Sequence, residues 1–488
     1  MEKRWQVIAL LFSVALCAGQ QTPAQEGGNA QQDAIRKLES RVDELKAQLA
    51  DIQSQLDAIR GAKVPQTGAI ASAPTALPPQ TQFSPEQQLE AAGRSTQEHQ
   101  TFAEDEEDAP RIYNAPLEPT YPGFFYLPGT HTMLRIDGFA RTDFIYDPTI
   151  PTLSDAFLPS AIPIPAPSGP GNFTTSIRGS RFSGDFRVPA GSLGTARAFI
   201  QMDFFGPNGT TAPRLRHYYA QLENILVGQT FSNFMDPDTF ADTLDTQGAN
   251  SAISARVPQF RYSFGLGGGA SGYVSVEAPA TNVNFSVNGT AAVPLTPAPD
   301  ASLRFRNEWE HGHIQVASIF RDLSVQLPNG GPQESAFGWG VNVTGLVEVF
   351  GRDNFVFQVG YGHGISRYVG DAGGLGLDVA PNNLTDLSLR ALPLLAPTAS
   401  YQHYWTPVLR SNATFGFVQA QNTAFQPATT FHKSTYSSVN IIWNPFGSID
   451  LGAEFIYGWA QEKSGAHANA PRIQFTGRYR FVRLHEEQ

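Results

Sequence analysis

The amino-acid sequence predicts an all-β fold, a transmembrane antiparallel β-barrel of about 16 strands over residues 123–481. Charged and apolar residues alternate with a period of two through much of this range. After the N-terminus, no stretch reaches the roughly 18 uninterrupted apolar residues that a transmembrane helix needs. The 34 Phe and 15 Tyr, against one Cys and four Met, suit an envelope barrel with aromatic girdles.

The first segment, residues 1–19, is a predicted secretory signal peptide, because two basic residues precede an apolar run. Cleavage after Ala18 and cleavage after Gly19 both remain open. Lipidation of Cys17, the only cysteine, is the alternative, but Leu16 stands where a small residue is expected. A cleaved chain would have no thiol and no disulfide.

Residues 33–60 predict a short periplasmic α-helical coiled coil. Apolar residues recur at spacings of three and four through about four heptads, a period that winds helices around one another. A lone amphipathic helix is the alternative, but nothing nearby in the chain offers it a packing surface. The helix could also contact peptidoglycan. The heptad positions are Ile35, Leu38, Val42, Leu45, Leu49, Ile52, Leu56 and Ile59.

Residues 61–122 predict a flexible linker rich in Pro, Ala and Gln, with an acidic run at residues 104–108 that we interpret as solvated. The net charge of −11 is concentrated before the barrel, since residues 1–122 contain ten Lys and Arg against 17 Asp and Glu. No segment carries a dense basic patch, so nucleic acid is not an expected partner.

The barrel begins at residue 123, and residues 173–264 show its pattern best. They predict four strands in two hairpins, a long loop and a return strand. In the first of these strands, Arg181, Asp185 and Arg187 share one parity, while Phe182 and Phe186 lie on the other. Charges of both signs on one face and apolar residues on the other fit water inside and lipid outside.

Between strands, the predicted connections alternate in length, as short periplasmic turns and longer outer loops do in such barrels. Short turns are predicted at 189–194, 223–224, 311–313, 351–354, near 407 and at 444–448; long loops at 147–172, 232–255, 279–300, 367–397, 421–432 and 461–471, with 206–213 intermediate. The last strand, 472–481, ends on Phe481 as an outer-membrane assembly signal does, although the tail 482–488 follows.

The third outer loop, residues 232–255, follows those at 147–172 and 206–213, loses the alternation and predicts an inward constriction loop. It contains Asp236, Asp238, Asp242 and Asp245 among scattered Gly and Asn. Acids on this loop, facing arginines on the wall, would set a transverse field across the narrowest point. Turn capping is the alternative role, and it is favoured for Asp236, which precedes a proline.

The basic residues of the predicted barrel are 20 Arg and only two Lys. An Arg facing lipid near the membrane midplane costs roughly 2–4 kcal/mol, so parity places them in the lumen. Arg offers a fixed fork of donors that matches a carboxylate. Pairing with wall aspartates, which would merely stiffen the wall, is the alternative. The predicted selectivity residues are Arg135, Arg141, Arg181, Arg187, Arg197, Arg216 and Arg261, with Asp203, Asp242 and Asp245.

Several short motifs are specific in combination: 179–182 (GSRF), 202–206 (MDFFG), 215–220 (LRHYYA), 228–236 (GQTFSNFMD), 403–407 (HYWTP) and 450–458 (DLGAEFIYG). Together they resemble the DcaP-like trimeric outer-membrane porin family over nearly the whole barrel. Residues 241–245 match its loop pattern loosely. The resemblance implies a 16-stranded homotrimer in the outer membrane of a Gram-negative cell that takes up small organic anions, dicarboxylates being the associated class.

The sequence therefore predicts a porin for diffusive uptake of such anions, through an Arg-lined lumen narrowed by loop 232–255. No nucleophile motif, phosphate-binding Gly loop or Cys/His metal spacing is present, so no enzyme, cofactor or metal is expected. The dyad His311 and His313 lies in a predicted tight turn, a poor geometry for metal binding. A sugar or general solute porin and a structural tether between outer membrane and cell wall are the alternatives.

Overall fold

The computed structural model describes residues 123–149, 155–167 and 169–481. The predicted signal peptide (1–19), coiled coil (33–60), linker (61–122) and tail (482–488) lie outside the described residues.

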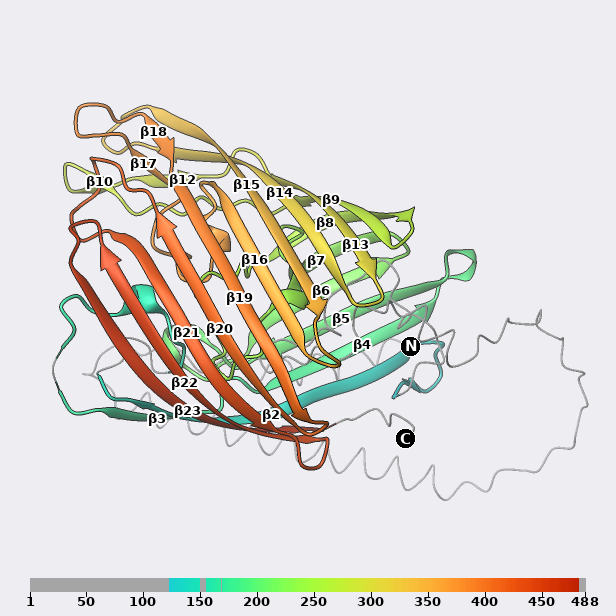
Figure 1. Cartoon of the computed structure of the whole chain (residues 1–488). Helices are drawn as coiled ribbons and strands as arrows, with labels where there is room; N and C mark the ends of the chain where they lie inside the picture. The colour runs from blue at the N-terminus through green and yellow to red at the C-terminus, as the bar shows by residue number, and fades with distance from the viewer. Residues whose placement is uncertain (1–122, 150–154, 168, 482–488) are drawn as a thin grey trace, which may run out of the picture. The chain divides into compact units, whose positions relative to one another are not determined.

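The described chain forms a closed antiparallel barrel of 16 strands, which confirms the predicted fold (Figure 1). Each strand pairs with the next strand of the barrel along the chain. The last strand pairs with the first from Phe139↔Arg480 to Tyr146↔Ile473 and closes the barrel. In chain order the strands are β2 (Met133–Asp147), β4 (Arg181–Pro189), β5 (Thr195–Asp203), β6 (Arg214–Leu222), β7 (Ile225–Phe231), β8 (Arg256–Gly267), β9 (Ala270–Glu277), β13 (Asp300–Trp309), β14 (Gly312–Gln326), β15 (Gln333–Glu348), β16 (Asn354–His363), β19 (Pro393–Thr406), β20 (Leu409–Ala420), β21 (Phe431–Trp443), β22 (Ile449–Glu462) and β23 (His467–Arg480).

Short elements extend the barrel strands or lie in its connections. They are the strands β1 (Phe125–Tyr126), β3 (Asn172–Ser176), β10 (Ser286–Val287), β11 (Thr290–Ala291), β12 (Val293–Leu295), β17 (Val379–Pro381) and β18 (Leu389–Ala391), and the 3-10 turns η5 (Pro159–Ala161), η6 (Gly191–Leu193), η7 (Pro207–Gly209), η8 (Pro237–Thr239) and η9 (Ser366–Tyr368). No helix in the described ranges has the length and apolar character needed to cross a membrane.

The predicted strand over residues 173–189 is divided in the structure. β3 and β4 both pair with β2, but one extra residue separates them at the break 177–180. There the Ser180 hydroxyl accepts the backbone N–H of Arg141 at 2.9 Å, in place of a ladder carbonyl. The period-two alternation of residue types does not reveal this break, because the Ser180 side chain replaces one backbone hydrogen bond of the ladder.

Short and long connections alternate, with short turns at the end of the barrel where β2 begins. The turn between β8 and β9 and the connection between β14 and β15 were not predicted, and two predicted loops have different ends. The loop predicted at 461–471 spans only 463–466, and the loop predicted at 367–397 ends where β19 begins at Pro393. Both misjudged ends are rich in small residues or proline, which do not distinguish the two faces of a strand.

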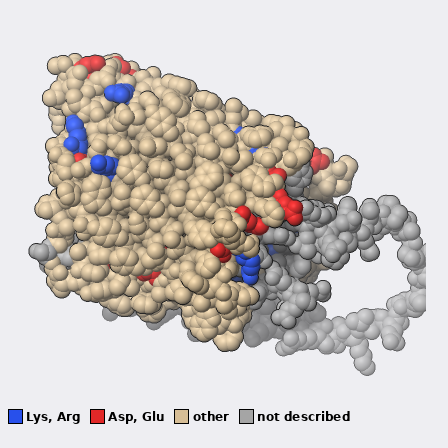
Figure 2. All heavy atoms as spheres, in the orientation of Figure 1, with Lys and Arg blue, Asp and Glu red and all other residues tan. Residues whose placement is uncertain are grey.

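The barrel buries polar and charged side chains and exposes apolar ones, the reverse of a soluble protein. On β5, Arg197 and Asp203 are buried, while Ala198 between them is exposed. Large apolar side chains point outward, as Phe182 (44% exposed) and Tyr218 (62% exposed) do. In the face that Figure 2 shows, most Lys, Arg, Asp and Glu lie toward the ends of the barrel, and the surface between them is mostly uncharged. A polar interior and an apolar exterior suit a water-filled pore in lipid.

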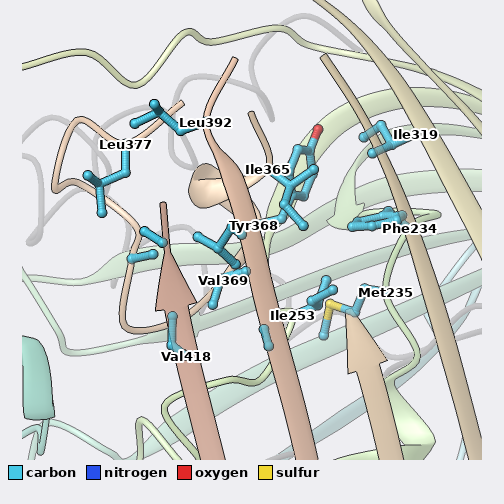
Figure 3. Packing of buried hydrophobic residues seen from close by; sticks show 14 of the residues in the cluster. Phe234, Met235, Ile253, Ile319, Ile365, Tyr368, Val369, Leu377, Leu392 and Val418 are labelled. Atoms are coloured by element: carbon cyan, nitrogen blue, oxygen red, sulfur yellow. The ribbon is translucent and has the colours of Figure 1, made fainter. Parts of the chain in front are cut away.

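Two loops fold into the lumen and share an apolar core (Figure 3). The predicted constriction loop, 232–255, is almost wholly buried. Residues 364–381, in the connection between β16 and β19, also turn inward, which the sequence did not predict. Ile253 and Val369 form a β-bridge between these loops, and both pack with Ile319 of β14 and Val418 of β20.

Candidate functional site: the lumen and its constriction loop

The constriction loop is anchored where it leaves β7. Glu277 of β9 accepts hydrogen bonds from the Ser232 hydroxyl (2.7 Å) and from the backbone N–H of Asn233 (2.8 Å). A few residues on, Asp236 caps η8 by accepting the N–H of Asp238 at 3.2 Å. Turn capping, which its place before a proline predicts, is therefore observed. The carboxylates at both points satisfy backbone donors that a loop inside a barrel would otherwise leave unpaired.

Asp236 also binds the barrel wall. Its carboxylate accepts from Arg306 Nη1 (3.1 Å), His313 Nε2 (2.9 Å) and Thr344 Oγ1 (2.6 Å) on three successive strands, β13, β14 and β15. Burial opposes ionisation, but His313 and Arg306 hold the pKa of Asp236 well below its usual range. The loop is thus fixed to this wall by a buried, ionised carboxylate.

Asp236, Asp238 and His313 converge closely enough to hold a metal ion. The guanidinium of Arg306 already pairs with both carboxylates, at 3.1 Å to Asp236 and 2.5 Å to Asp238. The positive charge that this cluster needs is therefore supplied by the chain itself. His311 lies apart, on the exposed turn, where it contacts Glu348 at 3.0 Å.

Asp242, in the middle of the loop, contacts the opposite part of the barrel. Its Oδ2 accepts from Arg410 Nε (2.7 Å), Gln402 Nε2 (3.0 Å) and Asn412 Nδ2 (3.2 Å) on β19 and β20. Asn440 of β21 donates to its backbone carbonyl at 2.7 Å. Every one of these contacts holds the loop against β19–β21.

Asp245 is anchored by β22. Glu454 accepts the backbone N–H groups of Leu244 (2.8 Å) and Asp245 (2.9 Å). The Asp245 carboxylate accepts the N–H groups of Phe157 and Gln247, each at 3.3 Å, with Oδ1 only. Burial raises the pKa of Asp245 to about 6, although Arg472 opposes the shift.

The two loop acids of the predicted site are held by the wall that follows the loop in the chain. Asp242 is bound to Arg410 on β20, and Asp245 lies beside β22. The loop reaches that side because two lumen-facing glycines make room for it. A Cβ on Gly452 would lie 2.7 Å from Leu244, and one on Gly360 would lie 2.6 Å from Ile253.

All seven predicted arginines are buried, on strands β2, β4, β5, β6 and β8. Four of them pair with wall aspartates: Arg141 with Asp143 (2.8 Å), Arg187 and Arg197 with Asp185 (2.8 and 3.1 Å), and Arg216 with Asp203 (2.9 Å). Asp203 also pairs with Arg214 at 2.6 Å. The remaining three are Arg135, Arg181 and Arg261. For the other four arginines, the structure thus shows the alternative role, which is pairing with aspartates of the wall.

Further buried arginines face the lumen from the second half of the chain. Arg304 and Arg306 alternate on β13 with the outward Leu303 and Phe305, a period-two signal that the sequence carries. The others on inward faces are Arg321, Arg410, Arg472 and Arg478. Most of these pair with carboxylates, for example Arg472 with Asp147 at 2.8 Å and Arg478 with Asp450 at 2.6 Å.

Aromatic rings lie behind several lumen guanidinium groups. The guanidinium carbon of Arg197 lies 5.0 Å from the ring centre of Phe199 and 5.6 Å from that of Tyr219. The guanidinium carbon of Arg304 lies 3.5 Å from the ring centre of Tyr273. Stacking on a ring face orients the guanidinium and leaves its N–H edge for oxygen acceptors.

A closed barrel with a charged interior, an apolar exterior and an inward loop defines an outer-membrane porin. Within that class, residues 127–481 match the model of the DcaP outer membrane protein family, and the chain belongs to this family.

Solved structures of outer-membrane channels resemble this chain. The outer membrane channel DcaP of Acinetobacter baumannii is 21% identical with a TM-score of 0.64, and the match covers 73% of this chain and 99% of that one. An anion-selective porin from Comamonas acidovorans is 9% identical with a TM-score of 0.47, covering 72% and 100%. OmpF of Salmonella typhi, in complex with daunomycin, is 10% identical with a TM-score of 0.45, covering 73% and 100%. Among curated proteins, none matches this chain.

Proposed function

We propose that this porin serves the diffusive uptake of small organic anions, dicarboxylates in particular. The N-terminal region lies in the periplasm, and the channel assembles as a homotrimer. The observation that carries the proposal is the excess of arginine on the wall of β4, β5 and β6. The inward residues of these strands include Arg181, Arg187, Arg197 and Arg216 against Asp185 and Asp203.

This excess matters because each of the two aspartates pairs with more than one guanidinium group. Asp185 lies within ion-pairing distance of both Arg187 and Arg197, and Asp203 within that of both Arg214 and Arg216. Each carboxylate therefore shares one negative charge between two positive ones. The wall keeps a positive potential, which raises the local concentration of anions in a narrow passage with low-dielectric walls.

The acidic residues of the constriction loop support the same conclusion, because they are paired with residues of the wall. Arg306 and His313 bind Asp236, and Arg410 binds Asp242, so these negative charges are compensated on the side of β13–β20. A permeating anion meets paired carboxylates on the loop and a surplus of guanidinium on the wall. A planar guanidinium suits a carboxylate, since it can donate two parallel hydrogen bonds.

A reversal potential tests this proposal. Purified porin in a planar bilayer under a potassium chloride gradient is expected to show preference for chloride, although the whole chain carries a net charge of −11. The surplus acid of residues 1–122 acts through screened fields, with a Debye length of about 8 Å at physiological salt. A clear preference for potassium would overturn the proposal.

The same preparation separates the alternatives. A sugar porin would show current block by sugars and no block by dicarboxylates. A tether between outer membrane and cell wall, acting through residues 33–60 and peptidoglycan, would carry no selective current.

A further inference from the structure

Arg261 and Arg304 lie on either side of β9, close to the point where the constriction loop leaves β7. Arg261 is on β8 opposite Ser275 of β9, and Arg304 is on β13 opposite Tyr273. Both side chains point inward and are more than nine-tenths buried. Adjacent strands lie about 4.8 Å apart, so roughly 10 Å separates the two backbones. Long side chains can converge across that distance.

Neither guanidinium has an ion pair among the described residues. Arg261 donates from Nε to Gln259 Oε1 at 2.9 Å and from Nη2 to the Phe231 carbonyl, both neutral acceptors. Arg304 stacks on Tyr273, and its Nε is buried without a hydrogen-bond partner in the described ranges. Two buried like charges thus face the lumen from the strands on either side of β9.

The neighbouring carboxylates are committed elsewhere. Asp236, Asp238 and Glu308 all lie within ion-pairing distance of Arg306, the next inward residue of β13. Glu277, the other nearby acid, accepts from Ser232, Asn233 and Ser275, at 2.7 to 2.8 Å. Glu277 forms no ion pair with Arg261, because its oxygens accept hydrogen bonds from the start of the loop and from Ser275.

We propose that Arg261 and Arg304 form an anion-binding subsite beside the constriction loop, which takes a small dicarboxylate with one carboxylate against each guanidinium. This proposal rests on the proposed function and names the residues of the lumen at which the permeating anion binds. A buried pair of cations that has no carboxylate in direct contact is electrostatically unfavourable, and a permeating dianion relieves that repulsion. The Tyr273 ring keeps the Arg304 fork oriented toward the ligand.

The subsite makes Arg304 a specificity-determining residue for dianions over monoanions. A monocarboxylate can neutralise only one guanidinium and leaves the other without a partner. Succinate and acetate are therefore suitable probes.

The test measures block of the chloride current through the purified full-length porin in planar bilayers. For the wild type, succinate should reduce the current at lower concentration than acetate. Arg304→Gln and Arg261→Gln should each raise the half-blocking concentration of succinate about tenfold, a loss of one charge-assisted contact. The half-blocking concentration of acetate should change by less than about threefold.

Two variants control for charge and folding. Arg390→Gln removes an equal charge from an exposed residue of β18 and should leave the block by succinate unchanged. Arg304→Lys keeps the charge but loses the planar fork and its stacking, so succinate block should remain weaker than in the wild type. If Arg304→Gln fails to form a heat-modifiable barrel, Arg304→Lys still tests the subsite.

The outcomes separate the two proposals. If the wild type prefers cations, the proposed function fails and the subsite fails with it. If the wild type prefers anions but succinate blocks Arg304→Gln and Arg304→Lys as it blocks the wild type, the channel function stands and the subsite is refuted. The subsite is also refuted, and the channel function again stands, if succinate and acetate block the wild type equally.

Discussion

Arginines on the lumen wall differ in how much of their charge neighbouring carboxylates take up. Arg197 shares Asp185 with Arg187 and stacks against Phe199, so its guanidinium is held in place and its counter-ion is divided between two arginines. Arg141 pairs with Asp143 at 2.8 Å and also donates to the Leu244 carbonyl of the constriction loop. Residues of the same type therefore divide between serving the permeant and holding the loop.

Replacing Arg197 by Gln should lower dicarboxylate flux and anion preference together. A charge-assisted hydrogen bond contributes roughly 1.5–3 kcal/mol before ordering costs, and the lower end of that range corresponds to a fall in flux of about tenfold. Heat stability of the assembled barrel should hardly change, because Asp185 keeps its bond to Arg187 at 2.8 Å. Ion selectivity, succinate flux and the temperature at which the oligomer dissociates on gels are the measurements.

Arg197→Lys serves as the matched control for this position. It keeps the charge and loses the fork, so it should restore anion preference better than it restores flux. Unchanged transport with a destabilised barrel in Arg197→Gln would mean that Arg197 only braces the strands.

At the scale of elements, the constriction loop is held by side chains from nearly the whole circumference opposite the basic wall. Its contacts run from Glu277 on β9, through Arg306 on β13 and Arg410 on β20, to Glu454 on β22. The inward loop 364–381 covers it, with backbone bonds such as Gly370 N–H to the Ala252 carbonyl at 2.9 Å. Fixed at many points, the loop can keep one pore width.

The Asp245 anchor should make this loop sensitive to pH. Burial raises the pKa of the folded group to about 6 from an ordinary value of 3.8, so folding favours the neutral carboxyl. Its contribution to docking is full below pH about 4 and is lost as the pH rises through about 6. A shift of this size corresponds to roughly 3 kcal/mol at most. Arg472, Arg141 and Glu454 are the charged groups near it.

Current fluctuations of the open channel should therefore increase between pH 4 and pH 7 in the wild type. Asp245→Asn should flatten this rise, because the amide stays neutral and its oxygen can accept the same two N–H groups. Asp371, in the covering loop, has a pKa that burial also raises to about 6, so a smaller rise should remain. Asp386→Asn changes an exposed carboxyl and is the control. Equal pH dependence in wild type and Asp245→Asn would exclude Asp245 as the titrating anchor.

At the scale of the whole molecule, the barrel closes on itself through pairing of β2 with β23, and both strands lie after residue 123. We therefore expect that deletion of residues 35–59 leaves a heat-resistant barrel trimer. The heptads would then reinforce or extend the assembly without being needed for it. Native electrophoresis of the purified deletion variant measures this, and a monomeric product would make the coiled coil the assembly element.

Much of the fold and part of the site can be predicted from the chain, for a physical reason that acts at each residue separately. Lipid penalises a charged side chain wherever it lies, so the parity of Arg181, Arg187 and Arg197 can be assigned strand by strand. Strand pairing also follows, because consecutive strands are joined by connections and need no distant partner. The interruption at residues 232–255 is visible for the same reason, since a stretch without alternation cannot form a wall strand.

The partners of the loop are decided only in three dimensions. Asp242 could pair with any of 20 barrel arginines, and it pairs with Arg410, which is 168 residues further along the chain. The closed barrel brings these groups together, and the glycines at 360 and 452 let the loop approach its wall. Which face of a strand points into the lumen depends only on that strand and its surroundings, so it can be deduced from the sequence. Pairing across the lumen depends on how far the loop reaches around a closed wall, which the tertiary structure alone determines.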